Sequence, residues 1–145
     1  KDYVAHVFET MMDRRVALGA FRFKTDLDRP LMRGIEFTTN IRSRTLGLPY
    51  GDQALFVRRR HFQAVSGFPQ LPVAEDLFFV QLMSKQGRIA IAPAHAITSG
   101  RRWNEMGVLR TTLINQLILA GFALGISPKT LARLYRRGTR KKRNI

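Results

Sequence analysis

Acidic side chains lie at two junctions between a loop and a predicted helix or strand, in a chain that is otherwise strongly basic. Asp52 lies in the segment Gly51-Asp52-Gln53, just before a short apolar run, and the pair Glu75-Asp76 follows a loop that contains two prolines. A carboxylate at such a junction can take a proton from a substrate hydroxyl when it lies within hydrogen-bond reach. These two junctions are therefore where we expect chemistry.

Ordinary structural roles could explain the same residues. Glu75 and Asp76 could be the acids that stabilise the N-terminus of a helix dipole, and Asp52 could be a turn residue after a glycine. A third segment, Arg101-Arg102-Trp103, follows Gly100. Its arginines could be a solvated basic pair, and its tryptophan could pack in a core or stack on a ligand.

The hydrophobic pattern predicts helices that alternate with short strands. Helices are expected at residues 3–15, 30–46, 59–66, 76–86 and 108–125 and from residue 128, and strands at residues 16–23, 54–57 and 88–92. Residues 101–103 are predicted to form a basic-aromatic loop. The alternation favours an α/β fold, although three strands are few for such a sheet.

Composition restricts the class of protein. The chain has 145 residues, is 45% hydrophobic, contains no cysteine and carries a formal charge of +15. It can therefore bury a core, forms no disulfide and has no thiolate metal site, and should be attracted to polyanions. His6, His61 and His95 lack metal-ligand spacing, and no signal peptide is visible.

The motifs, in their order and spacing, resemble the C-terminal part of family 2 glycosyltransferases of a small bacterial branch. The matching segments are Gly47 to Gln53, Phe56 to Arg59, Gly67 to Pro69, Glu75-Asp76, Gly87, Pro93, Thr98-Ser99, Arg101 to Trp103, Leu109 to Thr111 and Asn115. The resemblance covers nearly the whole chain except its basic end. It implies a GT-A fold and inverting transfer of a sugar from a nucleotide sugar to an acceptor hydroxyl.

The resemblance also implies roles for individual residues. It places the general base at Asp76. Residues expected to contact substrate are Gly51, Asp52, Gln53, Glu75, Arg101, Arg102 and Trp103. The family's Gln-x-x-Arg-Trp motif is matched only in part, because Ser99 stands where the glutamine would be. Arg102 could still stabilise the departing diphosphate, on which negative charge grows.

The donor side of the family's site is expected outside this chain. The resemblance places the nucleotide loop and the Asp-x-Asp ligands of a divalent metal, Mg²⁺ or Mn²⁺, before Val16. Asp26-Leu27-Asp28 matches the Asp-x-Asp pattern, but it follows the predicted strand and leads into Pro30, so we interpret it as a polar turn. Because the chain also starts with Lys1, we expect it to be a fragment. We predict that residues 1–107 form the acceptor side and catalytic part, that residues 108–137 form apolar and amphipathic helices, and that residues 138–145 form a basic tail.

The expected partners are a nucleotide sugar and an acceptor that could be lipid-linked. The apolar helix at residues 108–125 could pack in a core or lie on an anionic membrane. We expect a cytoplasmic protein, in contact with the inner face of the plasma membrane if that helix is interfacial. The alternative function is a small basic module that binds nucleic acid or anionic membrane without catalysis. Basic and aromatic residues do not interleave along a strand, so nucleic acid is not expected as a specific partner.

The missing donor side yields a first prediction. Residues 1–145 alone should not turn over a nucleotide sugar, because they lack the nucleotide loop and the Asp-x-Asp ligands. The measurement is sugar transfer and nucleotide release with several nucleotide sugars in the presence of Mg²⁺ or Mn²⁺. Robust turnover would show that the chain holds a complete site.

Overall fold

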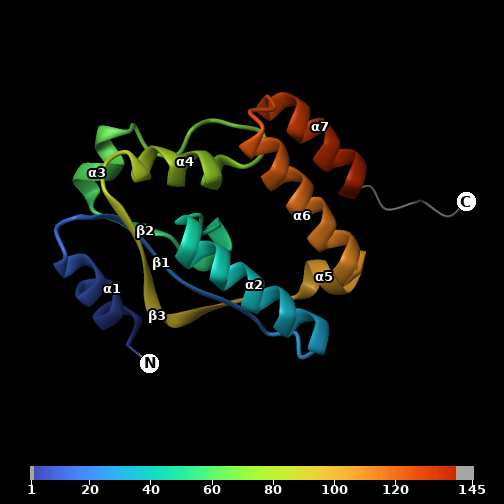
Figure 1. Cartoon of the computed structure of the whole chain (residues 1–145), viewed down its shortest axis with the longest axis horizontal. Coiled ribbons are helices and arrows are strands. Elements are labelled where there is room, and N and C mark those ends of the chain that lie inside the picture. Colours follow the sequence, from blue (N-terminus) through green and yellow to red (C-terminus); the bar gives the residue numbers. More distant parts are fainter. Residues whose placement is uncertain (1, 140–145) are drawn as a thin grey trace, which may run out of the picture. The chain divides into compact units, whose positions relative to one another are not determined.

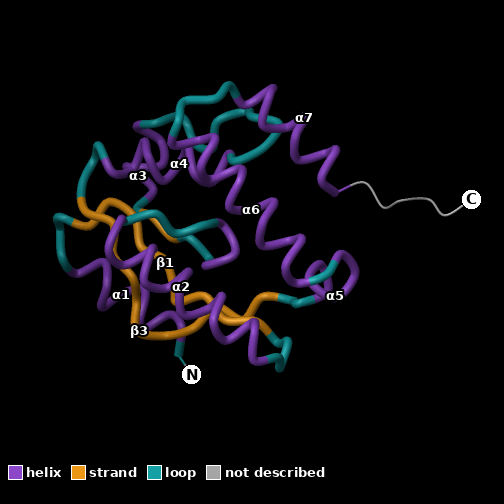
Figure 2. The backbone as a smooth tube through the Cα atoms, turned by 45° about the vertical axis from the view of Figure 1, so that its right-hand side comes forward, coloured by secondary structure: helices purple, strands orange, loops and turns teal. Residues whose placement is uncertain are grey.

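β1 (Val16–Thr25) is the central strand of a three-stranded sheet with the order β2-β1-β3 (Figure 1). β3 (Arg88–Thr98) runs parallel to β1, whereas β2 (Phe56–Val57) is antiparallel and pairs only with Leu18 and Gly19. The computed structural model describes residues 2–139. Helices precede and follow each strand, which confirms a mixed α/β fold (Figure 2).

The helices begin and end mostly where capping residues predict. Their bounds are α1 Tyr3–Met12, α2 Pro30–Leu46, α3 Arg59–Ala64, α4 Glu75–Ser84, α5 Arg101–Met106, α6 Val108–Ala123 and α7 Pro128–Thr139, with a 3-10 turn η1 at Gly51–Gln53. Pro30 opens α2, and Gly47 ends it in the left-handed conformation at φ 61°. Both positions suit these residues, because proline lacks the N–H that the first turn cannot use and glycine has no Cβ to clash.

The predicted end of β3 at residue 92 is wrong, because the strand continues through Pro93 to Thr98. The pairing register shifts between Ala20 and Arg22 of β1, so that β3 has extra residues at this point. Proline is tolerated in an edge strand at such an irregularity because its missing N–H breaks no ladder bond.

Polar side chains complete the edge of β1 where β2 has ended. The Gln53 amide donates to the Phe21 carbonyl (3.0 Å), the Asn40 amide bonds both the N–H and the carbonyl of Phe23 (2.8 and 2.9 Å), and the Thr25 N–H donates to Glu36 (2.7 Å). Phe21, Phe23 and Thr25 are alternate residues, so these backbone groups project from one edge. Buried backbone groups left without partners are costly, and these three side chains act as a substitute strand.

Two apolar clusters pack against the sheet. One joins Leu18 to Phe79, Val80 and Met83 of α4. The other joins Phe21 of β1 to Ala92 and Ala94 of β3, with Val7 of α1 and Phe56 packed on it. A Cβ on Gly19 would clash with the Phe56 ring, so the glycine leaves room for this aromatic side chain.

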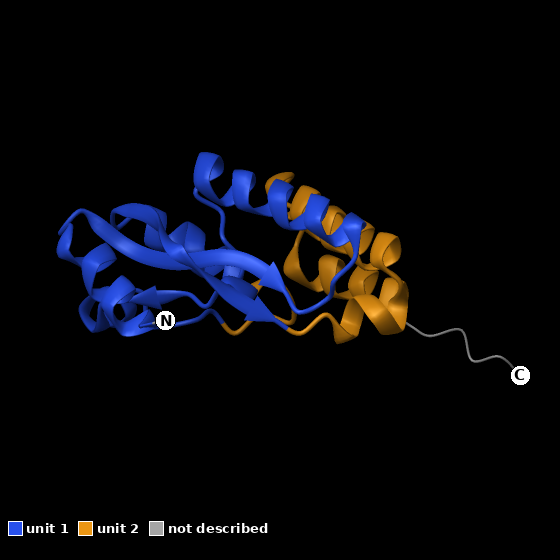
Figure 3. Cartoon of the chain, turned by 90° about the horizontal axis from the view of Figure 1, so that it is seen from below, with its two compact units in different colours: residues 1–69, 76–98 blue, residues 70–75, 99–145 orange. Residues whose placement is uncertain are grey.

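The chain divides into two compact units (Figure 3). Unit 1 comprises residues 1–69 and 76–98, and unit 2 comprises residues 70–75 and 99–145. We predicted a division at residue 108, but α5 groups with α6 and α7, and the Thr111 hydroxyl lies 3.5 Å from the Arg102 carbonyl. Residues 140–145 of the predicted basic tail lie outside the described residues.

Within unit 2, α6 and α7 approach closely at two glycines. A Cβ on Gly121 would lie 2.5 Å from Leu131, and a Cβ on Gly138 would lie 3.0 Å from Ile114. The Arg110 guanidinium also donates to the Gly138 carbonyl at 2.8 Å. Among the described residues, no helix is both long enough and apolar enough to cross a membrane.

The buried Glu36 carboxylate allows a test of the substitute strand. Burial raises its pKa, but bonds from the Thr25 N–H, Arg33 and the Thr25 hydroxyl outweigh burial and leave the pKa below its ordinary value. Glu36 therefore stabilises the fold above its unfolded pKa of about 4.3, and this contribution is lost as pH falls through the lowered folded pKa.

Replacing Glu36 by glutamine should lower the free energy of unfolding by about 1–3 kcal/mol at pH 7, because charge-assisted bonds become neutral ones. The difference from the unsubstituted protein should shrink below about pH 4. Urea unfolding at pH 7 and pH 3.5 measures both. Glu9→Gln, at an exposed carboxylate, is the control and should change stability little. An equal loss at both pH values would contradict the role of the charge.

Candidate functional site

Asp76 joins the 3-10 turn η1 to the start of α4. Its Oδ2 accepts the Gly51 N–H at 2.7 Å, and its Oδ1 accepts the Leu77 N–H at 2.8 Å. A Cβ on Gly51 would lie 3.2 Å from Asp76 Oδ2, so the glycine permits this close approach. The structure thus brings together two junctions that are 25 residues apart in the sequence.

Gln53 holds the other end of the η1 turn from inside the protein. Its side chain is fully buried, accepts the Ser43 hydroxyl at 2.8 Å and the Tyr50 N–H at 3.1 Å, and donates to Phe21. We predicted that Gln53 contacts substrate. With no exposed surface, its side chain instead connects α2, η1 and β1.

Asp52 is the middle residue of the η1 turn. Its carbonyl accepts the hydroxyl of Thr98 at 2.9 Å, which ties the end of β3 to η1. Its half-buried carboxylate lies close enough to Arg42 and Tyr50 to affect the pKa of each, as does the carboxylate of Asp76. We call Arg42, Tyr50, Asp52 and Asp76, with Gly51, the acidic-turn cluster.

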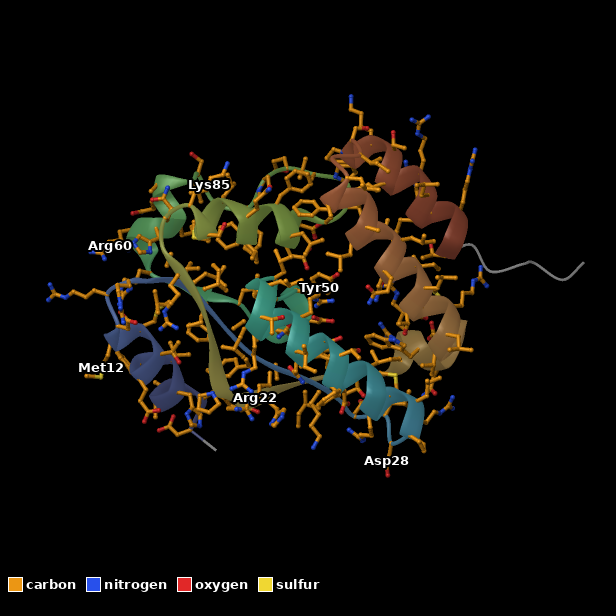
Figure 4. All side chains as sticks on the ribbon, viewed as in Figure 1. Met12, Arg22, Asp28, Tyr50, Arg60 and Lys85 are labelled. Atoms are coloured by element: carbon orange, nitrogen blue, oxygen red, sulfur yellow. The ribbon has the colours of Figure 1, made fainter. Side chains whose placement is uncertain are left out.

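Arg42 and Tyr50 are the parts of this cluster that the sequence analysis missed. The Arg42 guanidinium carbon lies 3.8 Å from the centre of the Tyr50 ring, and Arg42 Nε donates to the Leu48 carbonyl. Figure 4 labels Tyr50 beside α2. Among residues 2–139, the buried Tyr50 hydroxyl and Arg42 Nη2 have no hydrogen-bond partner.

The environment changes the acidity of both groups. Burial raises the pKa of Tyr50 to about 12, with the carboxylates of Asp76 and Asp52 adding to the effect and Arg42 opposing it. Burial also lowers the pKa of Arg42, which Tyr50, Asp52 and Asp76 oppose. Tyr50 is therefore a neutral phenol at physiological pH, able to donate a hydrogen bond.

Two alanines beside the cluster have a left-handed backbone. Ala54 follows η1 at φ 48°, and Ala74 precedes α4 at φ 60°. This conformation costs a residue with a Cβ roughly 1–2 kcal/mol, and such strain concentrates at functional sites. Each acid junction is thus next to one residue with an unfavourable backbone conformation.

The other predicted contact residues, Glu75 and Arg101 to Trp103, belong to unit 2. Glu75 is the exposed first residue of α4. The predicted loop at residues 101–103 is wrong, because these residues form the first turn of α5 in unit 2. There, the Arg102 guanidinium lies 5.0 Å from the Tyr135 ring centre, Trp103 is buried, and Arg101 is exposed.

Asp26-Leu27-Asp28 lies between β1 and α2, as expected for a turn. Asp28, labelled in Figure 4, pairs with Arg33 of α2 at 3.2 Å. Within residues 2–139 no group of three or more histidines, aspartates or glutamates could hold a metal ion. The divalent metal implied by the resemblance stays a prediction.

Comparison with family models, curated proteins and solved structures found no match to this chain. The family resemblance therefore remains a prediction from the motifs.

Gln53 provides a direct test of how the acidic-turn cluster is positioned. Gln53→Met keeps the approximate size but leaves the Tyr50 N–H and the Phe21 carbonyl without this partner, whereas the Ser43 hydroxyl keeps its bond to the Thr39 carbonyl. We expect a loss of about 2–4 kcal/mol in unfolding free energy, since each orphaned buried group costs about 1–3 kcal/mol and local relaxation recovers part. Gln63→Met, at an exposed residue of α3, should change stability by less than about 0.5 kcal/mol. Equal effects in urea unfolding would contradict the structural role of Gln53.

Proposed function

We propose that this chain supplies the catalytic base and the acceptor side of an inverting, GT-A-type glycosyltransferase that resembles family 2. The reaction moves a sugar from a nucleotide sugar to an acceptor hydroxyl. The observation that supports it best is the Asp76 carboxylate, which the N–H groups of Gly51 and Leu77 fix within the acidic-turn cluster.

The geometry of Asp76 suits a positioned base. Each carboxylate oxygen offers about two lone-pair directions, and each oxygen of Asp76 uses one of them for a backbone N–H. The remaining directions can accept the O–H of an acceptor. Because both oxygens are held, the carboxylate needs little reorganisation when the hydroxyl binds, and positioning of this kind supplies much of catalysis.

In the proposed step, the acceptor oxygen attacks the anomeric carbon on the face opposite the nucleoside diphosphate. The new carbon–oxygen bond forms as the bond to the diphosphate oxygen breaks, and the bonding electrons leave with the diphosphate. The acceptor proton passes to Asp76. Attack from the opposite face inverts the configuration of the anomeric carbon.

Arg42 and Tyr50 would orient the acceptor in this proposal. Tyr50 keeps its proton because its pKa is about 12, and its hydroxyl has no partner among residues 2–139. Donation to an oxygen of a sugar-like acceptor would require a local movement that uncovers this buried hydroxyl. Arg42 supplies a cation against the ring of Tyr50 and near both carboxylates.

The test compares Asp76→Asn with the unsubstituted protein in sugar transfer. The assay uses the complete gene product that contains this chain, with nucleotide sugars as donors and simple glycosides and lipid-linked sugars, which offer sugar hydroxyls, as acceptors. Turnover should fall by about 10²–10⁴, the usual contribution of one positioned acid or base, while binding of the nucleotide sugar is retained. Asparagine can replace only one of the two accepted N–H bonds, so stability should fall by about 1 kcal/mol.

Glu75→Gln is the matched control, because Glu75 is the neighbouring acid and is exposed. It should cost much less turnover than Asp76→Asn. Near-normal turnover of Asp76→Asn, together with loss of turnover in Glu75→Gln or Asp52→Asn, would overturn the assignment of the base. Failure of the complete gene product to transfer sugar from any donor tried would count against the proposed function itself.

A further inference from the structure

One face of α6, continued by the C-cap residue Leu124, carries leucines that are largely exposed. Leu109, Leu113, Leu117 and Leu124 are 71%, 61%, 59% and 80% exposed. The first three follow each other at intervals of four residues, so they lie on one side of the helix. The opposite side carries the buried residues Val108, Thr111, Ile114, Ile118 and Gly121.

The register of α6 against α7 extends this apolar strip onto α7. Gly121 lies against Leu131, and Ile114 lies against Gly138, so the two helices are antiparallel. By this register, Leu134, which is 49% exposed, is level with Ile118 of α6. We call Leu109, Leu113, Leu117, Leu124 and Leu134 the leucine strip.

Arginines adjoin the leucine strip on α7. Arg137 lies one turn after Leu134, and Arg133, Arg136, Arg137 and Thr139 line a shallow open depression. α7 also carries Lys129, and no acid lies between Pro128 and Thr139. Guanidinium groups gathered in this way suit the phosphate of a lipid headgroup.

We propose that the leucine strip and the α7 arginines bind an anionic lipid bilayer, with the leucines in the acyl boundary and the arginines at the headgroups. Apolar residues on one helix face, bordered by Lys and Arg, characterise interfacial helices. The inference concerns unit 2 alone and stands independently of the proposed sugar transfer.

Other occupants suit this surface less well. Two copies of α7 would repel each other, because each carries Lys129, Arg133, Arg136 and Arg137 without an acid. Protein interfaces concentrate aromatic anchors, whereas the strip is made of leucine. Nucleic acid would engage the arginines but would have no use for exposed leucines, since single strands stack on aromatic side chains.

The primary experiment measures binding of the full chain to vesicles of 70% POPC and 30% POPG, with pure POPC vesicles and RNA as comparisons. Leu113→Ser/Leu117→Ser should weaken binding to the anionic vesicles by about tenfold or more, because two apolar side chains no longer insert. Arg133→Gln/Arg137→Gln should weaken it about fivefold per charge, and higher salt should weaken it further.

The control variants carry the same types of substitution at exposed residues of unit 1. Leu31→Ser/Leu46→Ser removes exposed leucines of α2, and Arg59→Gln/Arg60→Gln removes exposed arginines of α3. Neither pair should change vesicle binding more than about twofold, apart from the general loss of charge. Circular dichroism and fluorescence of Trp103, the one tryptophan, check that every variant is folded.

A second measurement distinguishes insertion from adsorption by charge. The chain has no cysteine, so Leu117→Cys or Leu46→Cys can be labelled with the polarity-sensitive dye NBD. Anionic vesicles should shift the emission of NBD at residue 117 to the blue, and doxyl-labelled lipids should quench it, whereas NBD at residue 46 should change little. Unchanged binding of Leu113→Ser/Leu117→Ser with no shift at residue 117 would overturn the proposal. RNA binding that outcompetes vesicles would also overturn it.

Discussion

The second half of β1 has a strand on one side only, and this constraint shapes most of unit 1. Glu36, Asn40 and Gln53 supply the hydrogen bonds that a further strand would have made. Two of these residues lie on α2, so the edge of the sheet fixes the position of that helix. Gln53 lies in η1 and also binds the Tyr50 N–H, so the same edge fixes the turn that offers the Gly51 N–H to Asp76. The acidic-turn cluster therefore takes its position from backbone hydrogen bonding rather than from apolar packing alone.

Local signals in the sequence predicted most helix and strand starts, because those signals act within a few residues. Pro30 and Gly47 bound α2 as expected, and the three strands were all found. The errors lie where the chain departs from local rules. A proline usually ends a strand, but Pro93 lies within the edge strand β3, at a shift in the pairing register. α5 was missed because it has only six residues and follows Gly100, which has no side chain to cap a helix.

The candidate site was predictable only in part. The spacing of the motifs brought attention to Gly51 and Asp76, and the structure places them in direct contact. Gln53 has the same polar side chain whether it faces substrate or the core, so only the fold could separate the two roles. Arg42 gave no signal either, since a lone arginine on a helix is most often solvated. Its proximity to Tyr50 depends on how α2 meets η1, which sequence periodicity does not encode.

The charge of the acidic-turn cluster limits which half of a transfer reaction it could serve. By formal charge, the cluster carries two negative side chains, Asp52 and Asp76, against one positive side chain, Arg42, within a chain of formal charge +15. A diphosphate leaving group would be repelled by two carboxylates that a single arginine only partly offsets. A neutral hydroxyl would not be repelled, and it becomes more acidic as it attacks, which favours a nearby carboxylate. In the proposed transfer, the local charge that makes this cluster unsuitable for the donor's phosphates would suit the acceptor, and the cations that face the diphosphate would lie outside the cluster.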